Sequence, residues 1–475
     1  MMNLFVIGPE LFTLFSAAIF LAFSMGSSPR PLRDYRVAVL LSGIGLAVSL
    51  AAVQAVGDLF SAAYRVDFFS QVFKVLLSAG LFLVMYLCRE LKGVSYRHHP
   101  EFYLLLFTST LALMLLVSGV HLLGMYIGLE LSSYCLYILV ALNRDRALGL
   151  EAGVKYFLIG ISASALMIFG LAFLYSATGT LYVKDLSRML PGFMDRPMVV
   201  IGLLLTLSGF FFKLAVFPFH FWAPDVYQGA AHQVATYIAT VSKVAAAAVI
   251  IRTIAAAGAG SGYLTQVLAF LAVATMTIAN LAALAQKDLK RLLAYSSIAH
   301  AGYVLIGALS AGLAGRSGVI FYMLALLFMK LTAFLVVIRV APDGQNPAVS
   351  DLAGLHQRSP LLALALMVSL FSLAGIPPFI GFTAKFMIFT AAMQAGHFTL
   401  VLLAMINVVI SLYYYLIVLK AAYVLPPNEA LPPIRISPVE KGIVIVLILL
   451  MVGGGLYPSG IITVADAAAL MLMYP

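Results

Sequence analysis

The sequence predicts an all-α integral membrane protein with about fourteen transmembrane helices, ten of which form two inverted five-helix repeats. Three observations lead to this fold class. Hydrophobic residues make up 63% of the 475 residues and charged residues only 10%, whereas a soluble domain carries about 25% charged residues. The mean hydropathy is +1.07, and the apolar stretches are continuous rather than alternating, which favours helices over a β-barrel. Two long apolar stretches are interrupted by prolines.

A transmembrane helix needs roughly 20 apolar residues. The first candidate lacks a basic start and is too long for a cleavable signal sequence. The connections are short, so no separate extramembrane domain is expected. The predicted spans are 4–25, 36–56, 70–88, 102–118, 120–142, 152–177, 197–228, 232–255, 263–286, 291–311, 317–340, 359–395, 398–423 and 441–460.

Lysine and arginine residues are distributed unevenly between the two sides of this plan. Most of them fall in or beside the odd-numbered connections, which the positive-inside rule places in the cytoplasm. Both termini are then expected on the outer side. This distribution accounts for the net charge of +10 without a nucleic-acid partner. The even-numbered connections are assigned only Arg65, Lys74, Lys184, Arg188, Arg196, Arg252 and Arg316.

The seventh and twelfth spans are predicted to be broken helices. The seventh contains Pro218 and Pro224, and the twelfth contains Pro377 and Pro378. Proline removes a helical hydrogen bond and clashes with the preceding turn. The two breaks are five spans apart, an odd number, so the second copy of the motif crosses the membrane in the opposite direction. Paired broken helices in inverted repeats point to an ion site near the middle of the bilayer.

Spans 4–8 and 9–13 are therefore interpreted as the two repeats. The predicted segments are an N-terminal three-helix segment at 1–100, repeats at 101–256 and 257–425, and a C-terminal helix with its tail at 426–475. The glycine-rich residues 258–262 are expected to form a flexible turn and not a nucleotide-binding loop, because they follow a membrane helix and not a strand. Residues 425–433 are interpreted as an extended connector.

Four lysines and one glutamate are assigned to the interior of the predicted spans. A lysine at mid-bilayer depth costs about 2.5–3.5 kcal/mol on insertion scales, and a single carboxylate, Glu130, cannot pair with four lysines. Desolvation and a nearby carboxylate act on a lysine in opposite directions, so a buried lysine can load and release a proton. We expect a proton relay made of Glu130, Lys213, Lys243 and Lys385, with Lys330 as a further candidate.

Simpler interpretations exist for the same residues. Glu130 and Lys213 could form an ion pair that only holds two helices together. Lys330 could extend to the membrane surface or cap the carbonyls of a broken helix. His300, which lies beside hydroxyl residues, is expected to bridge water between Lys243 and Lys385, although it could be a hydrogen-bonded core histidine.

Several motifs resemble the antiporter-like membrane subunits of respiratory complex I, and most closely the branch that contains subunit N of NADH–quinone oxidoreductase. The similarity extends over essentially the whole chain and includes the fourteen-span plan. The motifs are the run from Phe211 to Ala230 around Lys213, the residues 239–243 that end in Lys243, the run from Leu289 to His300, and the glycine- and proline-rich residues 375–386 that contain Lys385.

The resemblance implies that Glu130 tunes Lys213, that Lys243 connects the two halves, and that Lys385 ends the second half. It implies a proton-translocating subunit in the inner (plasma) membrane of a cell, embedded in lipid beside other membrane-arm subunits. The chain itself would bind no cofactor. Flavin, iron–sulfur clusters and quinone would belong to partner subunits. Its cysteines, Cys88 and Cys135, are too few to hold an iron–sulfur cluster or a structural zinc.

Three other functions remain open from the sequence. A subunit of a multi-subunit Na⁺(K⁺)/H⁺ antiporter would share the broken helices. The equivalent subunit of a hydrogenase- or ferredoxin-linked complex would differ only in its partners. A passive scaffold that seals the membrane arm would not need ionisable groups that exchange protons.

Overall fold

The computed structural model describes residues 4–26, 30–142, 147–258, 262–310, 312–341, 344–426 and 433–472. Within these ranges the protein is almost entirely helical, and 13 helices are long and apolar enough to cross a membrane. The broken pair α16 (Pro360–Ala374) and α17 (Ile380–Gln394) supplies the remaining predicted span. The prediction of an all-α membrane protein with about fourteen spans is confirmed.

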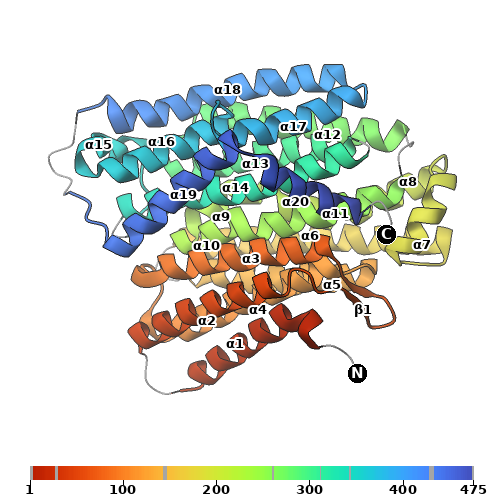
Figure 1. Ribbon diagram of the computed structural model, residues 1–475, viewed down its shortest axis with the longest axis horizontal. Helices are drawn as coiled ribbons and strands as arrows, with labels where there is room; N and C mark the ends of the chain where they lie inside the picture. The colour runs from red at the N-terminus through yellow and green to blue at the C-terminus, as the bar shows by residue number, and fades with distance from the viewer. Residues whose placement is uncertain are drawn as a thin grey trace. The chain divides into compact units, whose positions relative to one another are not determined.

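The chain divides into two compact units, and the first comprises residues 1–215, 229–267 and 467–475. Its central segment is α10 (His232–Tyr237), a π-helix (Ile238–Ser242) and α11 (Lys243–Ala257), which together are buried except at Ile254 and Ala255. The helices α1 and α2 pack against each other, α1 also packs on α4 and α2 on α3 (Figure 1). The other elements of this unit are α1 (Gly8–Ser24), α2 (Pro31–Ala51), β1 (Gly57–Leu59), β2 (Tyr64–Val66), α3 (Phe68–Leu87), α4 (His99–Ser118), α5 (Leu122–Ala141), α6 (Ala147–Thr178), α7 (Val183–Met189) and α8 (Pro197–Leu214).

The second unit comprises residues 216–228 and 268–466. Its most buried helices are α13 (Leu289–Leu309) and α14 (Leu313–Val340), and α14 packs against both halves of the broken pair, α16 and α17. The helix α18 (Phe398–Tyr423) packs on α16 (Figure 1). This unit also contains most of α9 (Trp222–Gly229) and α12 (Gly262–Leu284), together with α15 (Leu355–Arg358), α19 (Pro438–Leu456) and the first part of α20 (Ser459–Leu470).

Both broken helices end in the same way. The residue that follows the last residue of each helix is its C-cap: Ala215 (φ 66°) after α8 and Gly375 (φ 85°) after α16. Both C-cap residues adopt the left-handed conformation. Such a residue ends a helix because its N–H turns back to carbonyls of the last turn. The predicted breaks in spans 7 and 12 are thus confirmed. The inverted relation of the repeats and the four-segment division remain predictions.

The structure also differs from the sequence prediction. The hairpin β1–β2, the short helix α7 and the helix α20 were not predicted. Lys74 and Arg252 were assigned to connections, and this is wrong, because both are buried inside the helices α3 and α11. A charged side chain inside a span escapes a hydropathy reading when the residues around it are apolar. Parts of the predicted turn at 258–262 and connector at 425–433 lie outside the described residues.

Candidate functional site

Lys213 lies in the last turn of α8 and is buried. Its Nζ donates hydrogen bonds to Ser132 Oγ at 2.6 Å and to Ser133 Oγ at 3.0 Å, both on α5. Hydroxyl oxygens can accept from an ammonium group, and they can also donate to a neutral amine. Both hydroxyls donate to the carbonyl of Leu129 and therefore accept from the ammonium form of Lys213 as placed; after rotation either could donate to the neutral amine.

Glu130 lies on α5 within one helical turn of these serines. Its Oε1 accepts a hydrogen bond from Ser164 of α6, and its charge acts on Lys213. In the described part of the chain the two residues form no direct ion pair; the lysine contacts the serines and the glutamate contacts Ser164. The arrangement brings α5, α6 and α8 together around one carboxylate and one ammonium group.

Lys243 is the first residue of α11, directly after the π-helix. Its Nζ donates to the carbonyl oxygen of Leu214 at 2.9 Å, the last residue of α8. Lys213 thus lies in the last turn of α8, and the ammonium group of Lys243 contacts the C-terminal end of the same helix. The unpaired carbonyls of a helix C-terminus carry partial negative charge. Short π-helical turns occur often at functional sites.

Lys385 lies in the second unit, on α17, and has a similar environment. Its Nζ donates to the carbonyls of Leu373 at 3.0 Å and Ala374 at 2.9 Å, the last two residues of α16. It also lies 4.9 Å from the centre of the Tyr303 ring. The end of the first broken helix meets Lys243, and the end of the second meets Lys385.

Lys330 begins a chain of hydrogen bonds that the sequence did not predict. Its Nζ donates to Ser296 Oγ at 2.7 Å, and this hydroxyl is 2.5 Å from Tyr415 Oη. Tyr415 Oη lies 3.4 Å from His300 Nε2, and Tyr322 Oη is hydrogen-bonded to His300 Nδ1. Every member of this chain can donate and accept after a rotation or a change of tautomer, apart from the charged form of Lys330.

This geometry bears on the alternatives for Lys330. The side chain has 0% exposure, so it does not extend to the membrane surface. It also donates to the carbonyl of Leu293 at 3.1 Å, which lies inside the unbroken helix α13. Lys330 belongs to the buried polar chain that contains His300.

The six candidate residues form two groups, one in each unit. Glu130, Lys213 and Lys243 belong to the first unit. His300, Lys330 and Lys385 belong to the second. The proposed passage from Lys243 through His300 to Lys385 remains a prediction. Sequence reasoning did not assign roles to the hydroxyl partners Ser132, Ser133, Ser164, Ser296, Tyr322 and Tyr415. The available signal was that some of them lie close in sequence to Glu130 or His300.

The described residues contain no group of three or more His, Cys, Asp or Glu side chains arranged to hold a metal ion. Both cysteines are free and buried.

Residues 119–411 match the model of the family "NADH:quinone oxidoreductase/Mrp antiporter, TM". The chain is 63% identical over 472 residues to NADH-quinone oxidoreductase subunit N 2 of Syntrophobacter fumaroxidans, with 99% of this chain and 100% of that protein covered. It is 41% identical to the protein of the same name from Opitutus terrae, with 95% of each covered.

Solved structures agree with this similarity. A chain of respiratory complex I from Thermus thermophilus superposes with a TM-score of 0.84 at 35% identity, covering 96% of this chain and 98% of that chain. A chain of the Mrp complex from a Dietzia species gives a TM-score of 0.87 at 21% identity, covering 99% and 97%. The second likeness concerns the fold alone.

Proposed function

The chain belongs to the NADH:quinone oxidoreductase/Mrp antiporter transmembrane family, and we propose that it conducts protons as a membrane subunit of an NADH–quinone oxidoreductase. The pathway consists of Glu130, Lys213, Lys243, His300, Lys330 and Lys385 with bound water. The hydrogen-bond chain from Lys330 to His300 is the observation that carries this proposal. Residues that only hold helices together would not need a hydrogen-bond chain of this length, nor groups that can exchange protons along it.

Each group holds a proton in a definite place. An ammonium at Lys213 is stabilised by the serine hydroxyls and by the charge of Glu130, so movement of Glu130 toward or away from the lysine changes its affinity for a proton. In the second unit, Lys330 can give a proton to Ser296, which passes one to Tyr415 and then to His300. The chain must then reset by rotation of its hydroxyl groups before the next proton.

The energy for this transport comes from chemistry outside the chain. We assign flavin, iron–sulfur clusters and quinone to partner subunits, whose reaction drives the movements of charge at Glu130 and Lys213. One charge moved against 100 mV requires about 2.3 kcal/mol. The proposed setting is the inner membrane, with both termini on the outer side, as the distribution of basic residues predicts. In this proposal the protons move from the cytoplasm to the outer side.

Substitution of Lys213 by alanine in the assembled complex tests the proposal. We expect normal amounts of complex and electron transfer from NADH to quinone, with a reduced number of protons pumped per NADH oxidised. Unchanged pumping in the assembled variant would instead support a passive scaffold.

An antiporter subunit is the alternative, because the Mrp chain shares the fold. Vesicles that contain the complex distinguish the two. Proton pumping that is unchanged when Na⁺ and K⁺ are replaced by choline supports the oxidoreductase subunit, and pumping that requires either ion supports the antiporter. The hydrogenase- or ferredoxin-linked alternative is tested by the electron donor that copurifies with the chain.

A further inference from the structure

The helix α3 carries a stripe of buried polar side chains that the proposed pathway does not use. Its members, here called the α3 stripe, are Asp67 at the N-cap, Ser70, Gln71, Lys74 and Ser78. Their spacing of three, four and seven residues places them on one face of the helix. Polar groups in a membrane helix are costly, and those that face the protein interior often mark an ion pathway.

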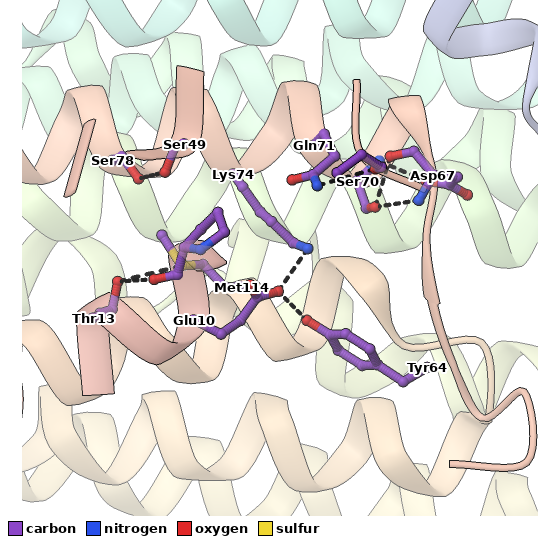
Figure 2. A network of polar contacts seen from close by, with 12 residues as sticks. Glu10, Thr13, Ser49, Tyr64, Asp67, Ser70, Gln71, Lys74, Ser78 and Met114 are labelled. Atoms are coloured by element: carbon purple, nitrogen blue, oxygen red, sulfur yellow. Dashed lines mark hydrogen bonds and ion pairs between the residues drawn. The ribbon is translucent and has the colours of Figure 1, made fainter. Parts of the chain in front are cut away.

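The centre of the α3 stripe is an ion pair with α1 (Figure 2). Lys74 Nζ lies 2.6 Å from Glu10 Oε1, and both side chains are almost completely buried. Tyr64 of β2 donates a hydrogen bond to the same glutamate oxygen. Glu10 lies in the first turn of α1, where a negative charge is favourable at a helix N-terminus, and the structure gives the carboxylate a buried cation as well.

A second ion pair connects the α3 stripe to α11. Arg252 Nη2 lies 3.2 Å from Asp67 Oδ2, and both charges act on Lys74. These two residues also line a pocket of about 410 Å³, together with Asp58, Arg65 and Lys184. The pocket lies beside the N-cap of α3 and is lined by Arg252 of α11 and by residues of the β1–β2 hairpin, on the face that is predicted to be the outer one.

Four buried polar atoms of this cluster have no hydrogen-bond partner among the described residues. They are Glu10 Oε2, Gln71 Oε1, Arg252 Nε and Lys74 Nζ, the last of which forms the ion pair with Glu10. Buried polar groups are ordinarily paired with protein or ordered water. Such atoms, in a cluster whose Arg252 lines the pocket, fit an internal water chain better than a closed structural ion pair.

We propose that the α3 stripe, with Glu10 and Tyr64, is a second proton pathway, which opens into the Asp67–Arg252 pocket. It rests on the proposed function, because it gives the Lys213–Lys243 group an exchange route to the outer face. The same helix α3 packs against α11 and against the π-helix that precedes Lys243.

The proton step conserves charge within the pair. Lys74 Nζ gives its proton to Glu10, which leaves a neutral amine beside a carboxylic acid. Glu10 then releases the proton to water that reaches the pocket, and Lys74 takes the next proton from the interior. Tyr64 holds Glu10 in place throughout by its hydrogen bond.

Two variants of the assembled complex in vesicles separate this role from a structural one. Lys74→Arg keeps the positive charge, but an arginine does not release its proton in proteins. The double variant Glu10→Leu with Lys74→Met replaces the ion pair by apolar side chains, which often preserves the stability of a fold. A pathway predicts that both variants lose pumping to an extent similar to Lys213→Ala, measured per NADH oxidised.

The matched control is the ion pair of the partly buried Arg339 on α14 with the buried Glu440 on α19. Its double variant, Arg339→Met with Glu440→Leu, is expected to keep pumping. Normal pumping by Lys74→Arg would overturn the inference, as would normal pumping by the Glu10 and Lys74 double variant. If the double variant does not assemble, Lys74→Arg alone decides. Should Lys213→Ala also pump normally, the proposed function fails as well; if only Lys213→Ala loses pumping, the failure is confined to the α3 stripe.

Discussion

The substitution Tyr415→Phe tests the buried hydrogen-bond chain by removing one oxygen atom. That oxygen lies 2.5 Å from Ser296 Oγ and 3.4 Å from His300 Nε2, so it joins these two groups. Phenylalanine keeps the ring and its packing and leaves little room for a replacement water. We therefore expect the complex to assemble normally and proton transfer through His300 to slow.

The magnitude follows from the charge that His300 carries when it holds the proton. A hydrogen bond to a charged group contributes about 1.5–3 kcal/mol. If the protonated histidine loses that much stabilisation, the step slows by roughly 10- to 150-fold. The stability of the folded protein should change less, by about 0.5–1.5 kcal/mol for a hydrogen bond between neutral groups.

The assay is the initial rate of proton pumping in vesicles, normalised to NADH oxidation. Tyr237→Phe is the control, because Tyr237 is also fully buried and its hydroxyl lies 2.8 Å from Thr110 Oγ1, a group that is not part of the Lys330 chain. It should pump normally. Pumping by Tyr415→Phe that equals the control would refute the claim that protons pass between Ser296 and His300.

Two further substitutions probe the ends of the broken helices. Replacing Ser132 and Ser133 together by alanine removes both hydroxyl partners of Lys213. We expect proton pumping to fall while NADH oxidation persists, and we expect a smaller loss of pumping when only one serine is replaced. The number of protons pumped per NADH oxidised measures both effects. In Gly381→Ala the new Cβ would lie 1.8 Å from the carbonyl oxygen of Ser372, so α17 must move away from the end of α16. This should destabilise the protein by about 1–3 kcal/mol, visible as a lower melting temperature, whereas Gly453→Ala, which meets nothing within 4 Å, should melt normally.

Hydropathy and proline positions were sufficient for the fold class and for the two broken helices, because lipid demands long apolar helices and proline interrupts them locally. The four lysines inside the spans were identifiable for the same reason. The hydrogen-bond partners of these lysines could not be identified from the sequence. Ser296 and Tyr415 are 119 residues apart and meet only when α13 and α18 pack together.

The pair of Glu10 and Lys74 shows a second kind of contact that could not be predicted from the sequence. Each residue lies near one end of its span, where a charge is compatible with a position outside the bilayer core, and 64 residues separate them. Nothing in either local sequence specifies that α1 and α3 bring them to 2.6 Å. The regular spacing of Asp67, Ser70, Lys74 and Ser78 was the available signal.

The broken helices explain why the lysines at their ends can be cationic inside a membrane. An unbroken helix satisfies its carbonyls internally, but a helix that ends within the bilayer leaves its last carbonyls free and concentrates partial negative charge there. The structure places Lys243 against the carbonyl of Leu214 and Lys385 against those of Leu373 and Ala374. These carbonyls stabilise an ammonium group on each lysine. Under the proposed function, each broken helix would provide a site at which a proton binds and departs, and the charge of Glu130 would adjust the proton affinity of Lys213.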